Sequence, residues 1–238
     1  MNSMVKLMGD RLEEGVAISR DYARSAGVAF EVCHLPFGVK VGGTEEEVRP
    51  FNEAMHKAID AAKLLGVEYA VLHPNTTTVP MECFDRQAQY DSVMAHLTPF
   101  AEHAAKVGLN IVVENMRVVP NGTPVHRYCQ NPDELCDIAD ALGIGICWDF
   151  GHANLTGNKQ SESLAYIGKR LKVLHVNDNL AADDDHIGNI VLVGLQNVGL
   201  DAAGAGIAAQ NNGVTGPEIA REEQLRRSLG SSLILLPL

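Results

Sequence analysis

The feature that most constrains this chain is an alternation of short apolar runs with longer amphipathic stretches. Each apolar run has the length of a buried strand, and the stretches between the runs show the apolar periodicity of helices. The runs end at His34, His73, Glu114, Asp149 and His175. Since strands that alternate with helices are joined by crossover connections, we expect these strands to lie parallel in one sheet.

Start and stop signals for the helices support this division. Thr44 followed by Glu47 is the signature of a capping box, and Gly66 and Gly108 stand where two long helices should end. The sequence predicts helices over residues 10–25, 44–65, 85–107, 132–142 and 161–170, and strands over 28–33, 67–72, 109–113, 144–148 and 171–174.

The spacing of the polar strand ends favours a barrel over an open sheet. The five residues lie 26 to 41 positions apart, and a (β/α)8 barrel uses roughly 31 residues for each strand and helix. An open doubly wound sheet usually carries a glycine-rich phosphate loop after its first strand. No G-x-G-x-x-G or Walker A sequence follows any predicted strand. We therefore expect an α/β fold, a (β/α)8 TIM barrel, with residues 1–238 forming a single domain.

Composition narrows the class of protein. The 238 residues are 46% apolar, which is enough to fill a core, and no apolar run approaches the roughly 18 residues of a membrane span. The start of the chain has no apolar signal segment, and the five cysteines are scattered without a C-x-x-C pair, so we expect a cytoplasmic protein with reduced thiols. A net charge of −11 argues against nucleic-acid or membrane partners and favours a small-molecule substrate.

The polar strand ends point to a metal ion. A buried carboxylate or imidazole is costly unless a hydrogen-bond network or a cation meets it, and a lone histidine is more often a satisfied core residue than a ligand. In a barrel, however, all strand ends converge on one volume. His152 follows Asp149 by three positions, and Asp184 and His186 come soon after the last of these strands. Nitrogen and oxygen ligands of this kind suit Mn, Mg, Zn, Co or Fe.

At these positions the chain resembles the xylose-isomerase-like TIM-barrel superfamily, over about residues 10–188. That group contains sugar and sugar-phosphate isomerases and epimerases, inosose dehydratases and endonuclease-IV-type DNA repair enzymes. The matching segments are His-Leu-Pro-Phe (34–37), Leu-His-Pro (72–74), Val-Glu-Asn-Met (113–116), Trp-Asp-Phe-Gly-His (148–152), Leu-His-Val-Asn-Asp (174–178) and Asp-x-His (184–186).

The resemblance implies a role for each position. Glu114, Asp149 and His175 would hold a divalent ion, Mn, Mg, Co or Zn, and Glu114 would also act in proton transfer through a metal-stabilised enediolate. His152 would orient a substrate oxygen as a second catalytic residue. His34, His73 and His186 are assigned to substrate binding, and Glu218 is a candidate fourth metal ligand.

Two other functions stay open. In the repair branch, a trinuclear zinc site also recruits His34, His73, His152, Asp184 and His186, so the residues present fit an endonuclease on abasic DNA as well. The Glu-Asn-Met segment and the acidic balance favour the isomerase or epimerase. The third reading is a non-catalytic sugar- or metal-binding remnant.

The chain also departs from the superfamily pattern at both ends. It begins at a helix leading into what resembles the third strand, and residues 187–213 carry no clear helix or strand signal. We therefore expect a barrel incomplete at the N-terminus and altered at its C-terminal end. Open sheet edges invite pairing with other chains, so we expect a homo-oligomer or an aggregation-prone protein, impaired as a catalyst.

Overall fold

The computed structural model describes residues 12–38, 42–118 and 122–177, together with Asn179, Asp184 and the backbone of residues 191–194. Its centre is a six-stranded sheet with the order β1-β2-β4-β6-β7-β8. The first five of these strands are parallel, as expected, and β8 runs antiparallel to β7. Their bounds are β1 Val32–His34, β2 Tyr69–Leu72, β4 Asn110–Glu114, β6 Gly145–Asp149, β7 Leu171–Val176 and β8 Val191–Gly194.

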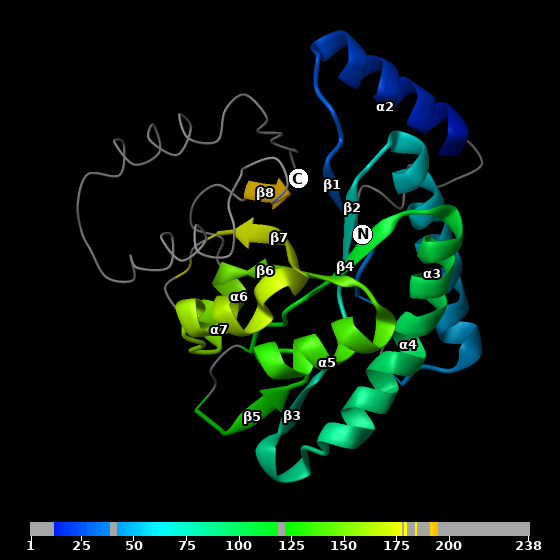
Figure 1. Cartoon of the computed structure of the whole chain (residues 1–238). Coiled ribbons are helices and arrows are strands. Elements are labelled where there is room, and N and C mark those ends of the chain that lie inside the picture. Colours follow the sequence, from blue (N-terminus) through cyan, green and yellow to red (C-terminus); the bar gives the residue numbers. More distant parts are fainter. Residues whose placement is uncertain are drawn as a thin grey trace.

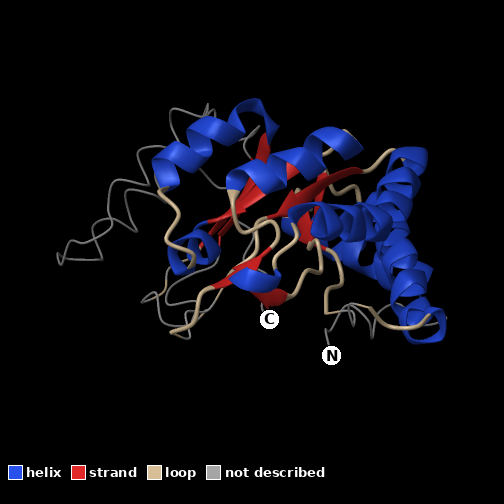
Figure 2. Cartoon of the chain, turned by 90° about the horizontal axis from the view of Figure 1, so that it is seen from below, coloured by secondary structure: helices blue, strands red, loops and turns tan. Residues whose placement is uncertain are grey.

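Helices follow the strands and cover the outer face of the sheet (Figures 1 and 2). The capping box of Thr44 and Glu47 opens α3, and a left-handed glycine, Gly66, ends it. Asp85 caps α4 through its side chain, and Gly108 ends that helix in the same way. The helices are α2 Leu12–Ala26, α3 Glu45–Leu65, α4 Arg86–Val107, α5 Pro132–Leu142, α6 Phe150–Leu155 and α7 Gln160–Ile167. None of these described helices has the length and apolar character that crossing a membrane requires.

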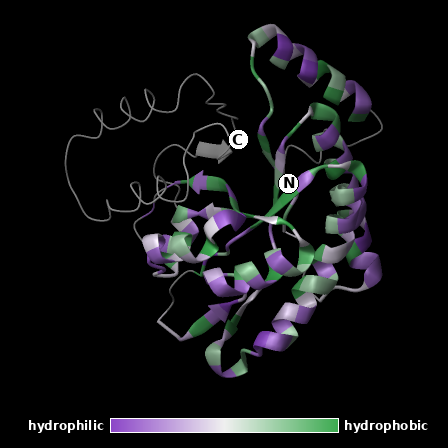
Figure 3. Ribbon diagram, in the orientation of Figure 1, coloured by the Kyte–Doolittle hydropathy of each residue, from purple (hydrophilic) through white to green (hydrophobic). Residues whose placement is uncertain are grey.

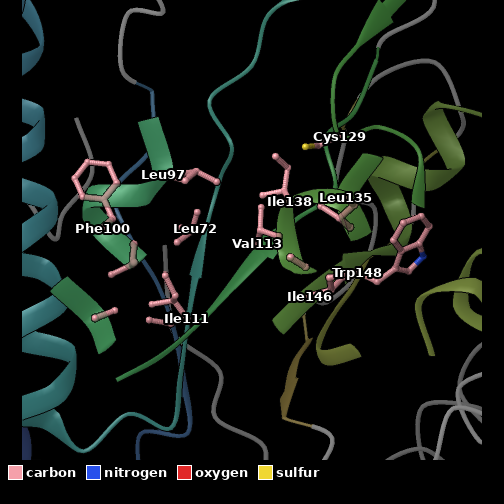
Figure 4. Close-up of a cluster of buried hydrophobic side chains, with 14 of the residues drawn as sticks. Leu72, Leu97, Phe100, Ile111, Val113, Cys129, Leu135, Ile138, Ile146 and Trp148 are labelled. Carbon is pink, nitrogen blue, oxygen red and sulfur yellow. The ribbon is translucent and has the colours of Figure 1, made fainter. Parts of the chain in front are cut away.

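The two faces of the sheet pack differently because successive strand side chains point to opposite sides. Outward residues such as Leu72, Val113 and Trp148 join the large core beneath α3, α4, α5 and α7 (Figure 4). Inward residues, including Val71, Val112, Cys147 and Val173, form a second, smaller apolar cluster inside the curl. Hydropathy colouring shows hydrophilic and hydrophobic residues alternating along the helices (Figure 3).

The sheet is curled into a half-barrel, which confirms the expected class of an incomplete TIM barrel (Figure 1). Its two end strands, β1 and β8, approach within 8 Å between Cα atoms. In the curl, the carboxyl ends of β1, β2, β4, β6 and β7 all face the same region. This arrangement positions the polar strand ends next to one another.

Three elements differ from the sequence-based expectation. Residues 78–80 and 125–127 form an antiparallel two-stranded ribbon, β3 (Thr78–Pro80) with β5 (Val125–Arg127), where we expected only loops. The short helix α6 directly after Asp149 was also not predicted. Residues 191–194 form β8, although the sequence of residues 187–213 gave no clear helix or strand signal; the rest of that range lies outside the described residues. Each of these elements is short and depends on a partner distant in sequence, so local periodicity does not reveal it.

Candidate metal centre

The polar residues at the strand ends point to the same side of the sheet as the inward-facing apolar residues that precede them. His34 follows Val32 by two positions, and the same spacing joins Val112 to Glu114 and Val173 to His175. The alternation that buries apolar side chains inside the curl therefore aims the strand-end residues at the same interior. As a result, His34, His73, Glu114, Asp149 and His175 meet at the carboxyl end of the half-barrel.

Glu114 lies at the middle of this group and is only 1% exposed. Its Oε2 is 3.2 Å from Nε2 of His34 and 3.1 Å from Nε2 of His73. Its Oε1 is 2.9 Å from Nδ1 of His175 and 3.5 Å from Nδ1 of His152. Each carboxylate oxygen thus faces two imidazoles that come from different parts of the chain.

Asp149 completes the set of three residues assigned to the metal. Its Oδ2 lies 3.5 Å from Nδ1 of His175, and its side chain is buried. Its Oδ1 accepts a hydrogen bond of 2.7 Å from the backbone N–H of His152 and so caps α6. Glu114 and Asp149 also form a tight cluster with His152, in which one donor atom of each residue lies within 4.8 Å of the others.

Backbone carbonyls orient two of the histidines. Nδ1–H of His34 donates to the carbonyl of Leu35 at 2.7 Å, and its Nε2 lies 3.2 Å from Oε2 of Glu114. His152 likewise donates from Nδ1 to the carbonyl of Asn115 at 2.8 Å. A buried carboxylate among imidazoles is stabilised by a proton or a cation that lies between them. The donor set of imidazoles and carboxylates therefore fits a divalent ion.

The buried carboxylate of Glu114 and the imidazoles around it shift one another's pKa values. Burial by itself would raise the pKa of Glu114, but His175 and His73 together hold this pKa well below its usual range. Burial lowers the pKa of His175, whereas Cys147 and Glu114 raise it, and the net result lies well above the usual value. Burial raises the pKa of the Cys147 thiol to about 12, so that thiol is neutral at pH 7. Glu114 is therefore the negatively charged partner that keeps His175 protonated.

Two asparagines hold Asp149 in place, one through its backbone and one through its carboxylate, and sequence reasoning did not assign them. Asn115 is fully buried; its Oδ1 accepts from the N–H of Asp149 at 2.6 Å and its Nδ2 donates to the carbonyl of Asp149 at 3.0 Å. Asn177 donates from Nδ2 to Oδ2 of Asp149 at 2.9 Å. Both positions stand in segments singled out by the sequence, Glu-Asn-Met and His-Val-Asn-Asp, which was the available signal.

Gly151 makes room for this arrangement. A Cβ atom at position 151 would lie 1.7 Å from Oδ1 of Asn177 and 3.1 Å from Nδ2 of Asn179. Asn179 also donates to the carbonyl of Gly151 at 2.9 Å. The glycine of Trp-Asp-Phe-Gly-His is thus required for close packing of α6 against the end of β7.

The mouth of the centre carries a third carboxylate and an arginine. Oδ2 of Asp184 lies 3.8 Å from Nε2 of His152 and is in direct contact with the guanidinium of Arg117. Arg117 itself follows β4 by three positions, after Glu114, Asn115 and Met116. The arginine was not predicted, because its partner lies far away in the sequence.

Arg127, on the ribbon strand β5, connects two of the loops that carry site residues. Its Nε donates to the carbonyl of Thr76, after β2, at 2.9 Å, and its Nη1 donates to the carbonyl of Arg117, after β4, at 3.3 Å. Among the described residues no carboxylate lies within salt-bridge distance of Arg127. Burial and the charge of Arg117 lower the pKa of Arg127 to about 10, so its side chain stays charged at pH 7.

Cys147 also lies at the centre, although the sequence pointed to it only as a reduced thiol. It forms a donor cluster with Glu114 and His175 within 4.8 Å. Two residues assigned from the sequence, His186 and Glu218, lie outside the described part of the chain.

Comparisons with known proteins agree with this architecture. Residues 8–232 match the family described as "Xylose isomerase-like TIM barrel". The uncharacterized protein MJ1311 of Methanocaldococcus jannaschii is 32% identical over 185 residues, which cover 71% of this chain and 61% of that protein. The chain therefore spans less than two thirds of the length of this relative.

Solved structures show the same fold at low identity. A D-tagatose 3-epimerase-like protein superposes with a TM-score of 0.60 and 24% identity, covering 76% of this chain and 67% of that one. The 3-keto-D-glucoside 4-epimerase YcjR of E. coli superposes with a TM-score of 0.57 and 14% identity, covering 94% of this chain and 74% of its own.

Proposed function

Because this chain belongs to the xylose isomerase-like TIM-barrel family, we propose that it is a divalent-metal-dependent isomerase or epimerase of a small sugar or sugar phosphate. The observation that carries the proposal is the position of Glu114 between four imidazoles, with Asp149 beside it. Of two proteins of the same fold, one is named a sugar epimerase and the other a sugar-epimerase-like protein, which supports this reaction class over others.

Glu114, Asp149 and His175 would hold the ion. A divalent ion bound by these residues supplies a Lewis acid that polarises the substrate carbonyl and acidifies the neighbouring C–H group. The choice among Mn, Mg, Co and Zn is left to measurement, because all four accept nitrogen and oxygen ligands.

The side chains of the centre account for proton transfer. The lowered pKa of Glu114 keeps its carboxylate ionised at neutral pH, which suits a metal ligand. We assign to the same carboxylate the acceptance of the proton next to the carbonyl, because it lies at the middle of the cluster. Delivery of a proton to the other carbon gives isomerisation, and delivery to the other face of the same carbon, from a group on that side, gives epimerisation.

The histidines would orient the substrate. Since His152 donates from Nδ1 to Asn115, its Nε2 is the acceptor that meets a substrate hydroxyl. His34 and His73 are more accessible, with side chains 24% and 16% exposed, and would contact the substrate from the opposite side.

The test combines metal analysis with isotope exchange on the purified protein. We expect about one equivalent of Mn²⁺ or Co²⁺ to bind per chain, with ketoses such as D-tagatose then gaining deuterium from D2O beside the carbonyl. Glu114→Gln, which keeps the shape and removes the charge, should abolish both the binding and the exchange. Metal binding without exchange would instead identify a non-catalytic protein, and several zinc ions per chain with cleavage of abasic DNA would identify an endonuclease.

A further inference from the structure

A groove between α3 and α4 lies next to the loop that follows β2, outside the metal centre. Its volume is about 320 Å³, and its walls come from α3, from α4 and from Pro74, Asn75 and Thr76. The two helices run side by side on the outer face of the sheet (Figure 1). This volume is at the lower end of the range for pockets that hold small molecules.

The described walls of the groove are polar and carry no formal charge. No lysine, arginine, aspartate or glutamate is among the described lining residues. Burial lowers the pKa values of His56 and His96, and His103 lowers that of His56 further, so both rings are neutral at pH 7. The polar lining consists of Asn52, His56, Thr76, Gln89, Ser92 and His96, together with Asn75.

Two of these groups are held in fixed orientations. Oδ1 of Asn75 accepts a hydrogen bond from the N–H of Gly38 at 3.4 Å, so its Nδ2 is the donor to Nε2 of His96 at 2.9 Å. Nε2 of His96 is then the acceptor and Nδ1 carries the hydrogen. Asn75 has a left-handed backbone with φ of 52°, a conformation that asparagine adopts more readily than most residues.

His56 lines the groove and carries an unsatisfied polar atom behind its surface. Its ring packs edge-on against Phe100 at 5.5 Å and stacks on His103 at 4.8 Å between ring centroids. Its Nε2 is buried and has no hydrogen-bond partner among the described residues. A buried nitrogen of this kind is costly, and a ligand in the groove would provide the missing partner after a small rotation of the ring.

We propose that this groove is a second small-molecule site, which binds a neutral polyhydroxylated compound such as a monosaccharide or a polyol. Neutral donors and acceptors match hydroxyl groups, while Val48, Val93 and Phe100 offer apolar surface to the C–H faces of such a compound. An ionic ligand is disfavoured because the groove would remove water from its charge, and no described lining residue carries an opposite charge to pair with it. The site is separate from the metal centre, yet Asn75 lies only two residues after His73, so the two sites share one loop.

The test uses D-sorbitol, a polyol without the carbonyl group that the proposed reaction needs. The full-length protein, labelled with ¹⁵N-histidine and treated with EDTA, is titrated with sorbitol while the ring nitrogen signals are followed by NMR. We expect the signals of His56 and His96 to shift and saturate with one dissociation constant. Shifts confined to His34, His152 and His175, or the lack of any saturable shift, would overturn the proposal.

A matched pair of variants on the same helix locates the binding. Ala95 and Ala105 are both exposed on α4, and only Ala95 lines the groove. Ala95→Trp should fill the groove and weaken sorbitol binding at least about tenfold, whereas Ala105→Trp should leave it unchanged. Equal affinity in the two variants would place the polyol elsewhere and refute the site. Metal binding measured on both variants reports separately on the proposed function.

Discussion

Glu114 and His175 form the closest carboxylate–imidazole pair of the candidate centre, with 2.9 Å between Oε1 and Nδ1. The raised pKa of His175 means that this ring carries a proton which a metal ion has to displace. The proton stabilises the metal-free centre at low pH and is lost as the pH rises through the raised pKa. Metal affinity should therefore increase with pH.

We expect the apparent affinity for Mn²⁺ to rise by up to about tenfold per pH unit between pH 6 and 8, as long as one proton is displaced per ion. Isothermal titration calorimetry in two buffers of different ionisation enthalpy would count the released protons. An affinity independent of pH would mean that His175 does not give up a proton to the ion.

Gly151 gives a second prediction at the scale of one residue. In Gly151→Ala the new methyl group would displace Asn177 from Asp149, because only 1.7 Å separates the Cβ position from Oδ1 of Asn177. Loss of an outer partner of this kind typically costs 10–100-fold in metal affinity, and we expect about that loss here.

Gly157 provides the control for this variant. It has a φ of 72° and no atom within 4 Å of its Cβ position, so Gly157→Ala adds backbone strain of about 1–2 kcal/mol without a collision. We expect Gly157→Ala to lower the melting temperature and leave metal affinity unchanged. The explanation for Gly151 fails if the two variants bind metal equally well.

At the scale of elements, the ribbon of β3 and β5 links the loops of the candidate centre through Arg127. Arg127→Met should leave the carbonyl groups of Thr76 and Arg117 without their donors, at a cost of about 1–3 kcal/mol in the free energy of unfolding. Because these loops carry His73 and Glu114 at their starts, metal affinity should fall as well.

Arg170→Met is the matched control, since Arg170 pairs with Asp140 at an exposed position away from the centre. Surface pairs of this type contribute about 0–1 kcal/mol. Chemical denaturation and metal titration of both variants compare the two arginines. If Arg127→Met resembles Arg170→Met in both measurements, the ribbon does not support the centre.

The elements that were predictable from sequence are those with a local cause. Thr44, Asp85 and Gly66 act within their own helices, so capping signals placed α3 and α4 to within a residue. The strand β8 and the ribbon have no such local signature, because their hydrogen bonds come from strands already formed elsewhere.

The same distinction applies to the centre. Its inward-facing residues were predictable because the alternation of side chains along a strand, and the residue at which the strand ends, can be read from neighbouring positions in the sequence. Parallel strands then place their carboxyl ends together. The contacts of Asn115, Arg117 and Arg127 depend on loops that meet only after the sheet has curled. Their residue types alone are also typical of ordinary surface and turn positions.

For the whole molecule, the region around β1 is the one we expect to meet another copy of the chain. Among the described residues β1 forms ladder hydrogen bonds only with β2, and β8 lies near its other side without pairing with it. Large apolar side chains are exposed on α2 and on both sides of β1, and such patches mark interfaces. They are Ile18, Tyr22, Val28 and Phe37.

We therefore predict a homo-oligomer, with a mass by light scattering above the 25.6 kDa of one chain. Tyr22→Glu places a charge on the exposed face of α2 and should shift the protein toward the monomer, because burying an unpaired carboxylate at an interface is unfavourable. Tyr166→Glu, at another exposed tyrosine on α7, should leave the mass unchanged. A monodisperse monomer for the unmodified chain would contradict the prediction, and a monomer from both variants would place the interface elsewhere.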